Sequence, residues 1–308
     1  MNTTTDMERK VMRQGPATLV VSLPSKWVKQ YNVKKGRTVQ VEEQGNTLQI
    51  YLTPHHEQKT IALNLSNTQP MTHRIVGALY KAGYDEMRLT YESSDEAKAI
   101  LETVQVMQGH EVMKHEKNKI FIKRIMQEDN ESFETIFRKC FHVLNDMAKD
   151  TLIALKENNK ELMQQVILKD KLMAIFADYA RRILLLGNKR ENVAESYHIA
   201  VQIEKIADRL KYLCRHYNEE KEKPSNNIIQ FCTKITAFLQ SFEKLFYNFS
   251  IEKATEFGKE RKKIQNFQKK IIKEISKKDI QAYHHCGDIL SSTFDLNGPI
   301  LEMHLKKN

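Results

Sequence analysis

The sequence VQIEKIADRL, residues 201–210, shows how the longer part of this chain folds. Ile203, Ala207 and Leu210 recur at intervals of three and four residues, which is the spacing of one face of an α-helix. Glu204 and Asp208 lie one helical turn apart and therefore share a face. The stretch predicts an amphipathic helix that buries one side and carries a pair of carboxylates.

The same periodicity continues from about Ser132 to the end of the chain. Six apolar stripes begin at Phe133, Leu162, Val193, Ile228, Ile264 and Ile280. Polar breaks at residues 158–159, 187–188, 219–227 and 248–250 separate helices, and short loops between long helices make antiparallel neighbours. Residues 130–308 are therefore predicted to form an all-α bundle of two three-helix repeats, 130–220 and 225–308.

Composition excludes several classes of protein. The chain has 308 residues and a net charge of +10. No stretch approaches the roughly 18 apolar residues of a membrane span, and the N-terminus lacks the apolar core of a signal peptide. The four cysteines form no CxxC pair, so we expect reduced core thiols and a cytoplasmic location. Common enzyme fingerprints are missing, and no activity as an enzyme is expected.

The first 125 residues differ from the helical part. Residues 60–125 alternate between strand and helix patterns, which predicts a small α/β domain over residues 58–126. Residues 1–54 read as strand, short helix, strand and strand, with a hairpin turn at Gln44-Gly45-Asn46. A unit this small buries too little to be stable alone, so we expect it to need a partner chain.

Three stretches of the N-terminal unit carry a resemblance to a known family. They are RKVMRQG at 9–15, VVSLPSKWV at 20–28 and VKKGRTV at 33–39. The pattern resembles the swapped-hairpin DNA-binding unit of the AbrB, MazE and SpoVT family, in which two chains interlace. The resemblance implies DNA contacts by Arg9, Lys10, Arg13 and Lys26. The alternative is a dimer clasp whose basic residues are ordinary solvated surface.

Residue spacing and a second resemblance suggest a metal site on the helical part. Carboxylates one turn apart, such as Glu204 and Asp208, can share a hard cation, although such pairs are usually a solvated face that Lys205 and Arg209 could neutralise. The stretches VILKDKLM (166–173) and IEKIADRL (203–210) resemble the three-helix repeat of PhoU, a phosphate-uptake regulator. That resemblance implies a metal ion, of unknown identity, held by Asp170, Glu204 and Asp208.

The second repeat departs from this pattern. Asp295 keeps the last acid, but Ser291 stands at the position of the glutamate, and Glu260 or Arg261 stands near the position of the remaining acid. A second metal site at Asp295 is therefore doubtful.

Both resemblances occur in this order in archaeal phosphate-uptake regulators. The chain is similar to them in having a small β-rich swapped-hairpin head, a small α/β middle domain and a PhoU-like bundle. This implies a dimeric regulator of phosphate uptake that binds double-stranded DNA and does not insert into membranes. The alternative is a regulator that docks on a phosphate transporter or signalling protein without binding DNA.

Overall fold

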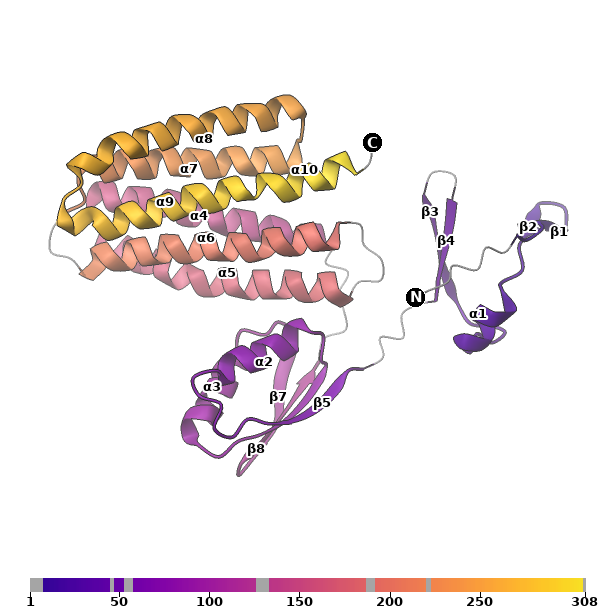
Figure 1. Ribbon diagram of the computed structural model, residues 1–308. Coiled ribbons are helices and arrows are strands. Elements are labelled where there is room, and N and C mark those ends of the chain that lie inside the picture. Colours follow the sequence, from indigo (N-terminus) through magenta and orange to yellow (C-terminus); the bar gives the residue numbers. More distant parts are fainter. Residues whose placement is uncertain are drawn as a thin grey trace. The chain divides into compact units, whose positions relative to one another are not determined.

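The computed structural model describes residues 8–44, 47–52, 58–125, 133–186, 192–219 and 223–306. The chain divides into two compact units, Met1–Glu57 and Gln58–Asn308. We refer to them as the head and the body. The body contains the α/β middle domain and the helical domain, which are coloured purple to magenta and magenta to yellow in Figure 1.

The head consists of two small antiparallel hairpins and one short helix. Its elements are β1 (Met12–Gln14), β2 (Thr18–Val20), α1 (Ser25–Gln30), β3 (Val39–Gln44) and β4 (Thr47–Leu52). Strand β1, which pairs with β2, is absent from the sequence prediction, because three exposed residues show no alternation. The predicted turn residues Gly45 and Asn46 lie outside the described residues.

The middle domain is a four-stranded mixed sheet with two helices on one face (Figure 1). Its elements are β5 (Thr60–Asn64), α2 (Thr72–Lys81), β6 (Glu86–Thr90), α3 (Ser94–Val104), β7 (His110–Glu116) and β8 (Lys119–Arg124). The strand order is β5-β6-β8-β7, with β5 parallel to β6 and the other pairs antiparallel. Its apolar core includes Val76, Tyr80, Met87 and Ile122.

Local sequence explains where α3 begins. The side chain of Ser93 accepts a hydrogen bond from the backbone N–H of Glu96, and the Glu96 carboxylate accepts one from the backbone N–H of Ser93. This reciprocal pair satisfies two donors at the helix start. The carboxylate of Glu96 also accepts from the backbone of Thr68, so it fastens the loop before α2 to α3.

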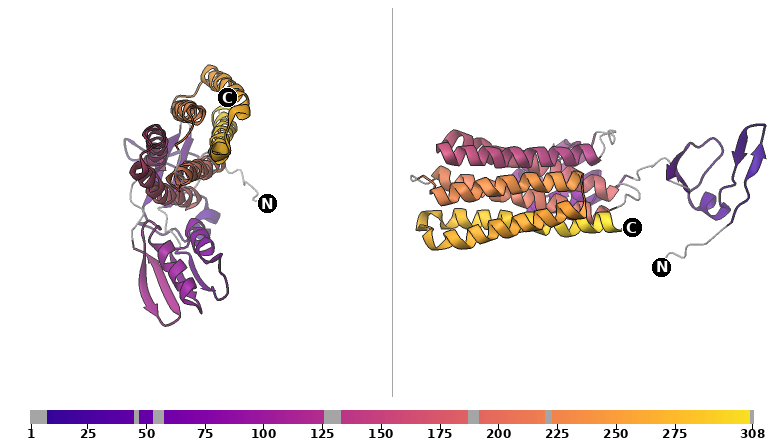
Figure 2. Two further views of the ribbon diagram at one scale, coloured as in Figure 1. Left: turned by 90° about the vertical axis from the view of Figure 1, so that its left-hand side faces the viewer. Right: turned by 90° about the horizontal axis from the view of Figure 1, so that it is seen from above.

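The helical domain is a bundle whose helices lie side by side in all views (Figures 1 and 2). Its helices are α4 (Phe133–Glu157), α5 (Lys160–Leu186), α6 (Val193–Glu219), α7 (Asn226–Tyr247), α8 (Ile251–Ile271), α9 (Ile280–Asp295) and α10 (Asn297–Leu305). Two 3₁₀ turns, Ile272–Glu274 and Lys277–Asp279, connect α8 to α9. Helix α6 packs against α4, α5 and α9, which places it at the centre of the bundle.

The breaks between helices follow from particular residues. Asn158 adopts a left-handed φ of 52° between α4 and α5, a conformation that asparagine tolerates better than most residues. The side chain of Ser250 caps α8 by accepting from the backbone of Lys253. Both positions are breaks that the sequence predicts. Within the described residues, no helix is long and apolar enough to span a membrane.

The bundle core is rich in aromatic rings and contains all the cysteines. Phe238 stacks on Phe257 with ring centroids 4.2 Å apart, and Phe137 meets Phe141 edge-to-face. The four cysteines are free and buried, which confirms the prediction of reduced core thiols. Burial raises the pKa of each thiol above its usual range.

Candidate functional site

Helices α5 and α6 run antiparallel, and a line of charged side chains follows the seam between them. The ion pairs show the direction, because Asp170 of α5 meets Lys211 of α6, whereas Arg181 meets Glu204. Small residues on the facing sides, such as Ala177 and Ala207, are fully buried and allow close packing. All three acids predicted as metal ligands lie on this seam, which we call the acidic seam.

Asp170 and Asp208 share one partner in the acidic seam. The ammonium group of Lys211 donates to Asp170 Oδ2 at 2.7 Å and also to Asp208 Oδ1. The side chain of Lys211 is only 13% exposed. Of the cations that the sequence places beside the acid pair, Lys205 is exposed and Arg209 bonds instead to Asp288, at 3.2 Å. Lys211 is therefore the cation that neutralises this part of the seam.

Glu204 lies in a second cluster rather than beside Asp170. Its carboxylate accepts from the guanidinium of Arg181, which also donates to Asp178. Asp178 in turn pairs with Lys81 of α2 at 3.1 Å. The cluster thus alternates in charge and reaches from the bundle to the middle domain.

Burial and ion pairing shift the pKa values of the charged side chains in the acidic seam in opposite directions. Burial raises the pKa of Asp170 and of Glu204, and the nearby cations Lys211 and Arg181 offset only part of that effect. Burial alone lowers the pKa of Lys211, but its bonds to Asp170 and Asp208 outweigh burial and raise that pKa above its usual value. Lys211 therefore stays protonated at neutral pH.

The residues of the acidic seam do not fit a metal ion as they are arranged. Each acid predicted as a ligand already accepts a hydrogen bond from a lysine or arginine. Within the residues that the structure describes, no three His, Cys, Asp or Glu side chains are grouped so that they could hold a metal. A bound ion would have to displace Lys211 or Arg181, and metal binding stays a prediction.

The second repeat has a different arrangement at the predicted position. Asp295 and Ser291 are both exposed. Arg261 places its guanidinium over the ring of Phe294, 4.7 Å from the centroid, and donates to Gln265. Arginine and an aromatic ring thus lie near Asp295.

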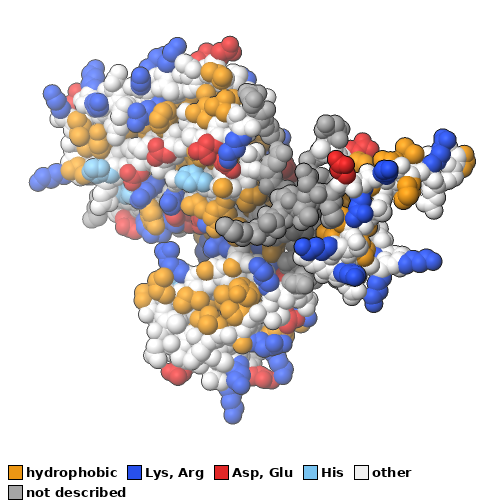
Figure 3. Space-filling view, turned by 45° about the vertical axis from the view of Figure 1, so that its right-hand side comes forward, with side chains coloured by type: hydrophobic (Ala, Val, Ile, Leu, Met, Phe, Trp, Pro, Cys, Tyr) orange, Lys and Arg blue, Asp and Glu red, His pale blue; other side chains and the backbone are white. Residues whose placement is uncertain are grey.

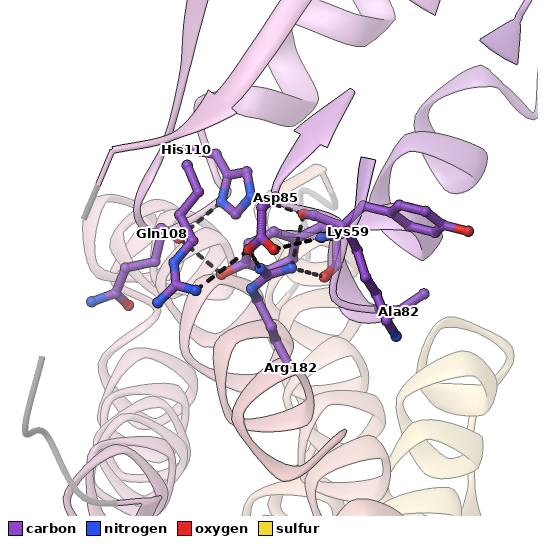
Figure 4. A network of polar contacts seen from close by, with 9 residues as sticks. Lys59, Ala82, Asp85, Gln108, His110 and Arg182 are labelled. Atoms are coloured by element: carbon purple, nitrogen blue, oxygen red, sulfur yellow. Dashed lines mark hydrogen bonds and ion pairs between the residues drawn. The ribbon is translucent and has the colours of Figure 1, made fainter. Parts of the chain in front are cut away.

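A second polar network joins α5 to the middle domain (Figure 4). Arg182 donates to the carboxylate of Asp85 at 2.7 Å, and both side chains are nearly inaccessible, at 3% and 2% exposure. The same guanidinium donates to the backbone carbonyls of Tyr80 at 2.6 Å and Tyr84 at 3.1 Å. Asp85 also accepts from the backbone N–H of Lys59. We call this network the Arg182 junction.

Two neighbours complete the junction. Gly83 has a φ of +90°, and a Cβ at this position would lie 2.5 Å from a side-chain carbon of Leu186 at the end of α5. The positive φ favours glycine at this position, whereas a rotation of the Leu186 side chain could relieve the close contact. His110 contacts Tyr84 O through Nε2 at 3.1 Å, and burial, with Arg182 nearby, lowers its pKa to about 4.

The head places its predicted DNA-binding residues on the surface. Arg9, Lys10, Arg13 and Lys26 are all exposed. Arg13 lies in β1 opposite Leu19 of β2. Figure 3 shows Lys and Arg side chains projecting from the head, with hydrophobic side chains exposed among them.

Comparisons with known proteins address the helical part. The phosphate transport system regulatory protein PhoU from Streptococcus pneumoniae is similar in structure, with a TM-score of 0.50 and 13% sequence identity. The similarity covers 56% of this chain and 94% of that chain. The helical domain has a PhoU-like fold. No protein-family model and no curated protein matches the chain.

Sequence reasoning missed the cations of both networks. Lys211 lies three residues after Asp208, and Arg181-Arg182 interrupts an apolar run in α5. A double arginine inside an apolar stripe is an available signal, because buried arginines are almost always paired. The identity of the partners depends on how α5 lies against α6 and the middle domain, which the sequence does not specify.

The first prediction concerns the Arg182 junction. Arg182→Met should lower the free energy of unfolding by about 3 kcal/mol, because it removes the closest cation of the buried Asp85 carboxylate and leaves the more distant Arg124, at 3.4 Å. Urea unfolding measures the effect. The matched control, Arg74→Met, removes an exposed arginine of α2 and should cost less than about 0.5 kcal/mol. Equal losses in the two variants would contradict the importance of the junction.

The second prediction concerns pH. His110 has a pKa of about 4 in the folded protein and near 6.5 in the unfolded chain. Its contribution to the free energy of unfolding is therefore present in full above pH 6.5 and is lost as the pH falls from 6.5 through 4. The difference corresponds to about 3 kcal/mol. Between pH 7 and pH 4 the wild type should therefore lose more stability than His110→Gln. His73→Gln, at an exposed position, should follow the wild type.

Proposed function

We propose that this chain is a dimeric DNA-binding regulator linked to phosphate supply. The resemblance to the archaeal phosphate-uptake regulators supports this assignment as a whole. The exposed basic side chains of the head support the DNA-binding part. The fold of the helical domain supports the link to phosphate. We propose that the protein acts by binding and not as an enzyme.

The observation that carries the proposal is the exposure of the head. No side chain that the structure describes in the head is buried. Large apolar side chains lie open to solvent, including Val11 at 64%, Leu19 at 70% and Leu48 at 66% exposure. Two isolated two-stranded hairpins are marginal in water without further packing. A second head that interlaces with the first would bury this surface and complete the fold.

Charge supports the choice of DNA as the ligand of such a dimer. Residues 1–52 carry eight lysines and arginines against four acidic residues, and dimerisation doubles this excess. Lysine and arginine side chains that neutralise phosphates release counterions and drive DNA binding. Arg9 and Arg13, near the first hairpin, are the residues that we expect to face the phosphates or guanine edges.

The PhoU-like fold supports an additional role in binding a protein partner. We propose that the helical domain receives or relays the phosphate signal by contacting a transporter or signalling protein. The same fold also supports the alternative, in which the head is only a dimer clasp and the protein regulates by docking. The two functions are distinguished by DNA binding.

The third prediction tests dimerisation. The wild type should sediment as a dimer in analytical ultracentrifugation. Leu19→Asp should shift it towards monomer, because the change places a charge on the surface that the second head would cover. Leu168→Asp changes an exposed leucine of α5 in the body and should leave the dimer intact. A monomeric wild type would contradict the interlaced head.

The fourth prediction tests DNA binding. The affinity for duplex DNA that contains the upstream region of this gene should fall steeply with salt. Arg9→Ala with Arg13→Ala should weaken binding and reduce the salt slope by about 1 for each phosphate that the variant no longer neutralises. Lys171→Ala with Lys205→Ala removes the same charge from exposed positions of the body and should have little effect.

The outcomes separate the two functions. Salt-dependent binding that the head variant alone weakens supports the DNA-binding regulator. A dimer that binds no DNA even at low salt would contradict it and favour the docking regulator.

A further inference from the structure

Lys211 has the environment of a bound cation. Its ammonium group bonds to carboxylates from two helices, Asp170 of α5 and Asp208 of α6, and only 13% of its side chain is exposed. An ammonium group has three donors and no acceptor, so two carboxylates use most of its capacity. Lys211 thus lies between the two acids, where an ion bridging α5 and α6 would also lie.

The charges along the acidic seam are already nearly balanced. Asp170, Asp178, Glu204 and Asp208 face Lys81, Arg181 and Lys211 through the bonds described above. Four carboxylates and three side-chain cations leave one net negative charge. A divalent ion added to the seam would reverse that sign, and the ammonium and guanidinium groups already bonded to the carboxylates would repel it.

Tethering favours the lysine over a free ion. Lys211 is part of α6, so its local concentration beside Asp170 and Asp208 is on the order of millimolar or above. A free metal ion would have to outcompete this tethered ammonium group. It would also leave the displaced ammonium group without its two carboxylate partners. Because removal of one partner from a buried ion pair is costly, displacement is unfavourable.

We propose that Lys211 is a built-in cation that takes the place of a divalent metal ion between Asp170 and Asp208. The carboxylates of Asp170 and Asp208 are then neutralised without metal, contrary to the expectation from the resemblance to PhoU. The proposal concerns the helical domain alone and does not depend on DNA binding by the head.

The experiment compares the full-length wild type with Lys211→Met, which preserves an unbranched side chain and removes its charge. Lys205→Met, which changes an exposed lysine earlier on α6, is the matched control. Thermal unfolding is measured after treatment with EDTA and after addition of excess Mn²⁺, an ion suited to carboxylate ligands. Isothermal titration calorimetry measures Mn²⁺ affinity.

The proposal predicts that neither EDTA nor Mn²⁺ shifts the unfolding temperature of the wild type or of Lys205→Met. Lys211→Met should unfold at a lower temperature, recover stability with Mn²⁺, and bind Mn²⁺ at least about tenfold more tightly than the wild type. Asp170→Asn added to Lys211→Met should abolish that gain, which assigns the ion to the vacated position.

Each of the following results would overturn the proposal. The first is a wild type that is purified with stoichiometric metal or loses stability in EDTA. The second is tight Mn²⁺ binding by the wild type. The third is a folded Lys211→Met variant with no gain in Mn²⁺ affinity. If Lys211→Met does not fold without metal, refolding it in Mn²⁺ should restore the native circular dichroism spectrum, and failure to do so also counts against the proposal.

Discussion

The buried ion pair between Arg182 and Asp85 is the interaction on which the body of this protein depends. Both groups are almost completely removed from water, where an unpaired charge would be very costly. Their pairing, together with the backbone carbonyls of Tyr80 and Tyr84, provides a polar attachment between the middle domain and α5. Such an attachment is directional, so it defines one orientation of the two domains, whereas apolar contact alone would permit sliding.

The acidic seam pairs the carboxylates of α5 and α6 with side-chain cations. The helical domain has the fold of PhoU, and the acids implied by that resemblance are present in the first repeat. Their surroundings decide what they can do. A lysine and an arginine from neighbouring turns bind them as counterions, so the same carboxylates that would be ligands in an open seam serve here to hold helices together.

Much of the architecture could be predicted from the sequence, because it depends on local patterns. The stripe through Ile203, Ala207 and Leu210 identified α6, and Asn158 and Ser250 marked breaks that the structure contains. Strand β1 was missed, since its three residues are exposed and carry no periodic signal. The partners of Glu204 and Asp208 were also missed. They depend on the register of two helices and on a domain contact, and both are set by tertiary packing.

Arg181 and Arg182 are consecutive residues, yet they bond to different parts of the protein. One reaches across the seam to Glu204 of α6, and the other reaches into the middle domain to Asp85. Successive side chains on an α-helix point about 100° apart, so α5 is held from two directions at the same level along its axis. Helix α5 therefore couples α6 to the middle domain. If α6 rotates α5 about its axis, either the middle domain turns with α5 or one of the two ion pairs breaks.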